Sequence, residues 1–413
     1  MKFHNNGNRR VVVTGLGVIS SIGLGWEEFW KNLLAGKSGI SKISSFDTTN
    51  YDRHYAGEVK NFDPYKFIDR RKAKKIGRTS QMTLAATKLA LKDANLKLEG
   101  IDKRRIAVCV GTTVGELRHL ERYYDYKKIQ EDPFHKEMIG AFPSNSLSSF
   151  VSTELGLKGC NIVIATACAA GNYAISYAYD LLMTGRADYV LAGGADSLSR
   201  VVFTGFARLY SIASEKCQPF DRSRQGMIPG EGAGIILLET LENAKKRDAR
   251  IYAEVLGYGL SNDAKYMTIP TASGVVKAMN KSIKCSNIKV EEVNYICAHG
   301  TGTKENDKIE CEAIATTFGK LTKNIPISSI KSMLGHTMGA AAVLEAIACC
   351  LAIKDNKLPP TINFNEFDPE CNIDCVANKS RDCEVNIVLN NAQAFGGNNS
   401  CLVLKGVNDC EAR

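Results

Sequence analysis

The chain has 413 residues, of which 44% are hydrophobic and 23% charged, and its formal net charge is +9. This length exceeds what one ordinary core needs and predicts two fused halves or two domains. No apolar run reaches the length of about 18 residues that a membrane-spanning helix needs, and residues 1–10 lack the apolar core of a secretion signal, so we expect a cytoplasmic protein that binds no membrane.

Strand-like and helix-like segments alternate along the chain, which predicts α/β architecture. The helix-like segment at residues 80–91 carries small and apolar residues at helical spacing. The strand-like runs are rich in β-branched and small residues and end in glycine; in the first half they are residues 10–15, 106–111 and 189–194.

The second half repeats the pattern of the first. A strand, a tight turn and a helix of small residues occur at 161–182 and again at 324–351. Each half also closes with a strand, at 234–240 and at 400–405. We therefore predict a duplicated α/β unit whose halves are residues 1–250 and 251–413.

A basic segment at residues 69–78 holds six cations and one anion. With the net positive charge it favours an acidic partner, either nucleic acid, an anionic membrane or an acidic carrier protein. Nucleic acid is disfavoured because the segment lacks interleaved aromatic residues and any binding motif. The alternative to a partner site is an ordinary solvated helix face.

The 14 cysteines are irregularly spaced and include no CxxC pair, which favours reduced thiols and disfavours a metal site. Cys168 stands apart because it ends a β-branched run and opens a helix of small residues. A helix N-terminus favours negative charge, so we expect a nucleophile with a lowered pKa. The alternative is a buried structural cysteine.

Two of the six histidines, His299 and His336, lie in turns rich in glycine that follow strands. A cysteine with two imidazoles suits carbon–carbon bond formation driven by decarboxylation, in which the cysteine holds an acyl group and the imidazoles stabilise an enolate. Lys331 is expected to orient His336 or a nearby carboxylate, with Glu345 as the candidate partner. The alternative for Lys331 is an ordinary buried ion pair.

Several motifs together resemble one family, the β-ketoacyl-(acyl carrier protein) synthase II enzymes of type II fatty-acid synthesis and the related type II polyketide ketosynthases. The motifs are Val11–Gly17, Thr166–Cys168, Pro219–Gly234, His299–Thr303, Lys331 with Gly335–His336, and Phe395–Gly397. The resemblance covers nearly the whole chain. It implies a thiolase-like, duplicated αβαβα five-layered sandwich that forms a homodimer, or a heterodimer with a chain-length factor.

The resemblance also implies the reaction. Cys168 would accept an acyl chain from acyl carrier protein (ACP), and malonyl-ACP would lose CO₂ and attack that chain to give a β-ketoacyl-ACP two carbons longer. The substrates are carried on the phosphopantetheine of the carrier protein, and no bound cofactor or metal is expected. Further implied roles are the oxyanion hole at the Cys168 and Phe395 backbone N–H groups, pantetheine binding by Thr301, Thr303 and Thr268, structural support from Asp307 and Glu310, an acyl pocket at Val114, and ACP docking by Arg71, Lys74 and Lys75.

One turn departs from the family pattern. Typical fatty-acid members read Phe-Gly-Phe-Gly-Gly where this chain has Gln393-Ala394-Phe395-Gly396-Gly397. The gating Phe395 is kept, whereas Ala394 restricts the backbone of the first hinge position. This predicts an altered gate motion or a pocket mouth suited to a more polar chain, and leaves fatty-acid and polyketide pathways both open.

Three related classes fit less well. A non-catalytic chain-length partner would lack Cys168. A degradative thiolase would need a second cysteine in a Cys-x-Gly turn near the C-terminus, and an initiating synthase of the third type would have Asn in place of His336.

Overall fold

The structure, a computed structural model, describes residues 9–129 and 140–407. Its framework is a 12-stranded sheet. From one edge to the other the strands are β13 (Asp374–Cys375), β11 (Pro326–Ser328), β10 (Tyr295–Cys297), β15 (Ile387–Gln393), β16 (Asn398–Lys405), β9 (Ala253–Asn262), β1 (Val11–Ser20), β8 (Gly232–Thr240), β7 (Tyr189–Asp196), β5 (Ile106–Gly111) and β6 (Asn161–Ile164), with β2 (Gly23–Leu24) beside β1.

The pairing pattern repeats about the centre of this sheet. In the first half, β6, β5 and β7 are parallel, and β8 and β1 follow in antiparallel pairing. In the second half, β11, β10 and β15 are parallel, and β16 and β9 follow in antiparallel pairing. The halves join through a short antiparallel ladder between β1 and β9. This repetition agrees with the predicted duplication, and the exact boundary near residue 250 stays a prediction.

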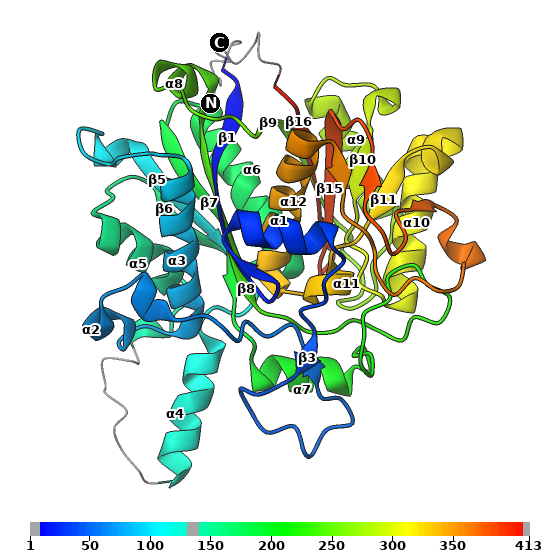
Figure 1. The fold of residues 1–413 in the computed structure, drawn as a ribbon, viewed down its shortest axis with the longest axis horizontal. Coiled ribbons are helices and arrows are strands. Elements are labelled where there is room, and N and C mark those ends of the chain that lie inside the picture. The colour runs from blue at the N-terminus through cyan, green and yellow to red at the C-terminus, as the bar shows by residue number, and fades with distance from the viewer. Residues whose placement is uncertain (1–8, 130–139, 408–413) are drawn as a thin grey trace.

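The helices form the other layers (Figure 1). Their bounds are α1 (Trp26–Leu34), α2 (Arg70–Ala73), α3 (Arg78–Asp93), α4 (Leu117–Ile129), α5 (Ser146–Leu155), α6 (Ala170–Met183), α7 (Arg200–Arg208), α8 (Leu241–Lys246), α9 (Ala272–Cys285), α10 (Lys304–Phe318), α11 (Lys331–Leu334) and α12 (Ala341–Asp355).

The layers stack as helix, sheet, helix, sheet, helix. Helices α3 and α5 cover the outer face of the first half of the sheet, and α9 covers the outer face of the second half with α10 packed against it. Helices α6 and α12 contact each other between the two halves (Figure 1). The predicted five-layered αβαβα sandwich is therefore confirmed.

Small residues let the central helices approach the strands closely. A Cβ added at Gly111 of β5 would overlap the backbone of Ala170 at the start of α6, and one at Gly194 of β7 would overlap the Gly339 carbonyl before α12. The turns before α6 and before α12 are thereby held against the ends of strands, which is where the sequence analysis expected the reactive side chains.

The predicted strands and helices of both halves are present, with ends shifted by a few residues. The helix expected at 80–91 is α3, and the two central helices expected at 169–182 and 339–351 are α6 and α12. Every cysteine in the described ranges is a free thiol, as expected. Within those ranges no helix is long and apolar enough to cross a membrane.

Candidate active site

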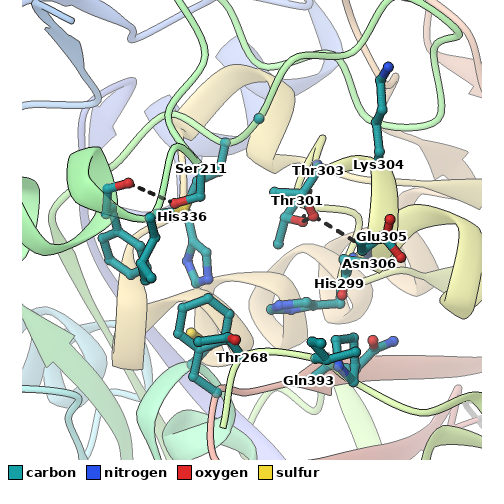
Figure 2. Close-up of a pocket in the computed structure, with 18 of the residues that line it drawn as sticks. Ser211, Thr268, His299, Thr301, Thr303, Lys304, Glu305, Asn306, His336 and Gln393 are labelled. Atoms are coloured by element: carbon teal, nitrogen blue, oxygen red, sulfur yellow. Dashed lines mark hydrogen bonds between the residues drawn. The ribbon is translucent and has the colours of Figure 1, made fainter. Parts of the chain in front are cut away.

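A cavity of about 420 Å³ lies beside the ends of β6, β10 and β15 and is lined by the predicted nucleophile. Both predicted imidazoles line it too (Figure 2). The elements that bring them together come from both halves of the chain. The predicted site residues that line this cavity are Cys168, Thr268, His299, Thr301, Thr303, His336 and Phe395.

Cys168 lies in a short 3-10 turn, Ala167–Ala169, directly before α6. Ala167 has a φ of 48°, a strained left-handed conformation that projects the cysteine from the end of β6. The backbone N–H groups of Cys168 and Phe395 both point to the thiol. These are the two donors that the family resemblance assigns to an oxyanion hole.

The predicted lowering of the Cys168 pKa is wrong. Burial raises the pKa of the thiol to about 12, and this effect outweighs the nearby Lys331 charge and the two backbone N–H groups, which lower it. The placement at a helix N-terminus was predicted correctly, but the helix cannot offset the loss of hydration of a thiol that is only 7% exposed.

His336 is held in one orientation by the turn between α11 and α12. Its backbone N–H donates to the Ile228 carbonyl at 2.6 Å, and its carbonyl accepts from the Gly230 N–H at 2.8 Å. Its Nδ1 accepts a hydrogen bond from the Met338 N–H at 3.1 Å. A neutral imidazole that accepts at Nδ1 carries its proton on Nε2, so the free ring nitrogen of His336 is a donor.

His299 follows β10 and is fixed through its backbone. Glu310 accepts from the His299 N–H and the Gly300 N–H, both at 2.8 Å, while Lys331 Nζ donates to the His299 carbonyl at 2.6 Å. The ring centroids of His299 and His336 are 5.4 Å apart with an interplanar angle of 83°.

Both imidazoles are neutral donors or acceptors rather than cations. Burial holds the pKa of His299 well below its usual range, and the positive charge of Lys331 and the neighbouring His336 lower it further. Burial and Lys331 act in the same direction on the pKa of His336.

Lys331 and Glu345 form a buried ion pair, each 1% exposed, as the sequence suggested. Burial raises the pKa of Glu345 to about 7, although the Lys331 charge lowers it. Of the two partners considered for Lys331, the carboxylate is the one found, because the Lys331 ammonium donates hydrogen bonds to Glu345 and to the His299 carbonyl.

The turn at residues 299–303 rests on a second buried carboxylate. Asp307 accepts from the Gly302 N–H at 3.2 Å and from the Phe220 N–H at 2.8 Å. Thr301 and Thr303 line the cavity with their hydroxyls 2.9 Å apart. Asp307 and Glu310 therefore support the turn, as expected, while the threonines face the space that a substrate arm would use.

The cavity opens to solvent between exposed apolar side chains. Tyr210 is 91% exposed and Met267 is 75% exposed, and Thr268 lies beside Met267. The Phe395 ring lies 5.9 Å from the ring of Phe206 and is partly exposed. Phe395 thus lines the cavity with part of its ring open to solvent, and its role as a gate stays a prediction.

Two predicted features lie away from this cavity. Val114 does not line it; the Val114 N–H donates to Asp196 at 3.1 Å, and its assignment to an acyl pocket at a subunit interface stays a prediction. Arg71 lies in α2, with Lys74 and Lys75 directly after it, and all three are exposed. Asp69 caps this helix with its side chain.

The sequence analysis missed Asp196, a fully buried carboxylate at the end of β7. It accepts from the Thr112 hydroxyl and from the Thr113 and Gly339 N–H groups, each at 2.7 Å. Asp196 thereby ties the turn after β5 to the turn that carries His336. The available signal was an acidic residue at the end of an otherwise apolar strand.

No group of three or more His, Cys, Asp or Glu side chains in residues 9–129 and 140–407 is arranged to hold a metal ion.

Comparison with known proteins identifies relatives along the whole chain. The family model described as "Beta-ketoacyl synthase, N-terminal domain" matches residues 8–244, and "Beta-ketoacyl synthase, C-terminal domain" matches residues 252–365. The chain is 38% identical to 3-oxoacyl-[acyl-carrier-protein] synthase 2 of Synechocystis sp., covering 96% of this chain and 98% of that protein. It is 39% identical to the protein of the same name from Coxiella burnetii, covering 97% and 99%.

Solved structures agree. "The ishigamide ketosynthase/chain length factor" superimposes with a TM-score of 0.94 at 42% identity, covering 97% of this chain and 100% of that chain. The AntDE:AntF complex, described as a type II PKS acyl-carrier protein in complex with its ketosynthase bound to the hexaketide, gives a TM-score of 0.88 at 34% identity with the same coverage.

Proposed function

The chain belongs to the β-ketoacyl synthase family, and we propose that it condenses malonyl-ACP, with loss of CO₂, onto an acyl chain carried by Cys168. The product is a β-ketoacyl-ACP two carbons longer. The observation that supports these roles best is the convergence of Cys168, His299 and His336 on one cavity, with two backbone N–H groups directed at the thiol.

The first step is acyl transfer. The Cys168 sulfur attacks the thioester of acyl-ACP, the bond to the carrier sulfur breaks, and the thiol proton ends on the released carrier thiol. The N–H groups of Cys168 and Phe395 stabilise the oxyanion of the tetrahedral intermediate because they are already oriented toward the sulfur. They also favour the thiolate, which otherwise is disfavoured by burial.

The second step is decarboxylation of malonyl-ACP. Its carboxylate leaves as CO₂, and the electron pair of the broken carbon–carbon bond forms an enolate at the thioester. His336 donates from Nε2 to the enolate oxygen, since its Nδ1 already accepts from Met338. His299 lines the same cavity and supplies the second imidazole. Neither ring needs to gain a proton, which suits their lowered pKa values.

The third step joins the two carbons. The enolate carbon attacks the acyl carbonyl on Cys168, and collapse of the intermediate expels the Cys168 thiolate, which takes up one proton. Lys331 and Glu345 are positioning residues in this scheme, because they hold the His299 backbone and the local charge rather than touch the substrate.

The acidic partner in this scheme is the carrier protein. Arg71, Lys74 and Lys75 offer an exposed cationic surface, and such surfaces steer an acidic partner more than they add affinity. We propose that the enzyme binds no cofactor of its own and that its substrates are carried on the phosphopantetheine of the carrier protein. We also propose that it is located in the cytoplasm. The chain would act with a second copy of itself or with a chain-length factor.

A polyketide or polyene pathway is the second candidate. It is favoured by the 42% identity to the ishigamide ketosynthase/chain length factor structure.

The experiment combines the protein with acyl-ACPs of several chain lengths and malonyl-ACP, and follows CO₂ and product mass beside Cys168→Ala. We expect a β-ketoacyl-ACP two carbons longer, absent from the variant. CO₂ release without elongation would indicate a missing chain-length factor or a specialised starter. No reaction of either substrate would refute the proposed function.

Charge reversal at Lys74 and Lys75 tests docking. It should raise KM for acyl-ACP more at low salt than at high salt. An unchanged KM would refute the docking assignment.

A further inference from the structure

Gln393 is a buried polar residue in the wall of the catalytic cavity. It ends β15, immediately before the turn that carries Phe395, and is 3% exposed. It lines the same cavity as His299 (Figure 2). Cys168 lines that cavity too. Its backbone is paired with Asn399 in the β15–β16 ladder, so the position of its Cα is fixed.

The side-chain amide of Gln393 has neither of its hydrogen-bonding groups satisfied. Nε2 and Oε1 are both buried, and neither has a partner among the described residues. Neighbouring amides are at least half satisfied: the Asn390 Nδ2 donates to Ala342 and Asn172 and the Asn399 Nδ2 donates to Asp263, although the Oδ1 atom of each also lacks a partner. A wholly unpaired buried amide destabilises a fold unless a ligand completes it.

The required ligand must offer one donor and one acceptor. A hydrocarbon acyl chain offers neither, and the keto groups of a growing polyketide or the carboxylate of a malonyl group only accept. A secondary amide offers both, and the pantetheine arm that carries the substrates contains secondary amides. We propose that Gln393 binds the amide nearest the thioester sulfur of that arm, an inference that rests on the proposed function.

The Nε2 and Oε1 atoms of Gln393 are buried in the structure. The Gln393 side chain must therefore rotate slightly before it can contact the amide. Its terminal torsion is broad, and changes of side-chain conformation on binding are common. Gln393 thereby acts as a binding residue that holds the pantetheine arm in the cavity lined by His336 and Cys168. In this interpretation, the departure of the gating turn from the family pattern serves to bind the pantetheine arm rather than the acyl chain.

The test is a cycle that pairs one change in the protein with one change in the arm. Gln393→Met keeps the length of the side chain and removes both hydrogen-bonding groups. The matched substrate is malonyl-ACP whose arm has the N–H of the inner amide replaced by an ester oxygen. Rates are measured as kcat/KM for condensation with a hydrocarbon and with a keto-bearing acyl donor.

We expect the wild type to prefer the natural arm by about three- to tenfold, as for one neutral hydrogen bond, and Q393M to show no preference. The effect should appear in KM more than in kcat, because the amide is equally available in the ground and transition states. The thermal midpoint of Q393M without substrate should equal or exceed that of the wild type, which excludes misfolding as the cause.

Two results would overturn the inference. An equal arm preference in wild type and Q393M would show that Gln393 does not bind the amide. A changed discrimination between hydrocarbon and keto-bearing donors, without an arm effect, would place Gln393 in acyl-chain recognition instead. Both leave the proposed function intact, whereas failure of the wild type to elongate with natural malonyl-ACP would refute the proposed function and this inference together.

Discussion

His336 should work as a neutral hydrogen-bond donor, and two substitutions separate this role from proton transfer. Its Nδ1 accepts from Met338 at 3.1 Å, which places the proton on Nε2, and burial with Lys331 keeps its pKa well below the usual range. Removing one preorganised donor of this kind costs about 10²–10³ in kcat, or about 2.7–4 kcal/mol. We expect that loss for His336→Ala.

His336→Gln should retain most of the activity that His336→Ala loses. A glutamine amide can present an N–H at nearly the reach of Nε2 but cannot act as a base or carry a positive charge. We expect a loss of about tenfold or less, equivalent to about 1.4 kcal/mol of misaligned hydrogen bonding. The assay is CO₂ release from saturating malonyl-ACP with Cys168 already acylated.

The pH profile gives an independent check. Because the pKa of His336 is lowered, the neutral donor persists as pH falls through 6.5, and activity should decline only well below that value. Acylation of Cys168 and the thermal midpoint serve as controls for both variants. An H336Q enzyme as slow as H336A, with a wild-type inflection near pH 6.5, would refute the neutral-donor account.

Three further predictions concern the surrounding groups. Lys331→Met should lower the free energy of unfolding, measured by denaturant titration, by about 3–5 kcal/mol because it leaves Glu345 buried without its partner. Adding Glu345→Gln to this variant should restore part of the lost free energy. Alkylation of Cys168 by iodoacetamide should keep accelerating above pH 9, since burial raises its pKa to about 12; a plateau below pH 9 would contradict this. Gly300→Ala should cut kcat about 10²-fold, because Gly300 has a φ of 36° and an added Cβ would lie 2.6 Å from the Ser329 Cβ and displace the His299 turn. Gly205→Ala, at an exposed glycine, is the matched control. Equal kcat values for the two variants would refute the effect.

The sequence predicted those parts of the site that depend on local pattern. Cys168 and His299 each follow a strand, and His336 follows the short helix α11 that comes directly after β11. Because strand ends of one sheet meet at a common edge, their convergence was foreseeable. The Lys331–Glu345 pair followed from the placement of a carboxylate on the helix after His336. Hydrophobic period and turn residues likewise predicted the repeated strands and helices.

Other features depend on tertiary packing that no local pattern contains. The pKa of Cys168 is raised rather than lowered because the fold buries the thiol. The local sequence around Cys168, residues 166–171, does not predict how deeply the tertiary structure buries that side chain. The His336 tautomer is set by the Met338 N–H in a turn where Met338 has a φ of 54°. The role of Val114 depends on a second subunit and stays a prediction.

Trapping the acyl-enzyme tests the central claim most directly. The protein would be mixed with a single equivalent of acyl-ACP without malonyl-ACP, and its intact mass and peptide map recorded before and after malonyl-ACP is added. The account predicts one acyl group on Cys168 that disappears as β-ketoacyl-ACP two carbons longer forms. An acyl group on another residue, or elongation by Cys168→Ala at the wild-type rate, would contradict it.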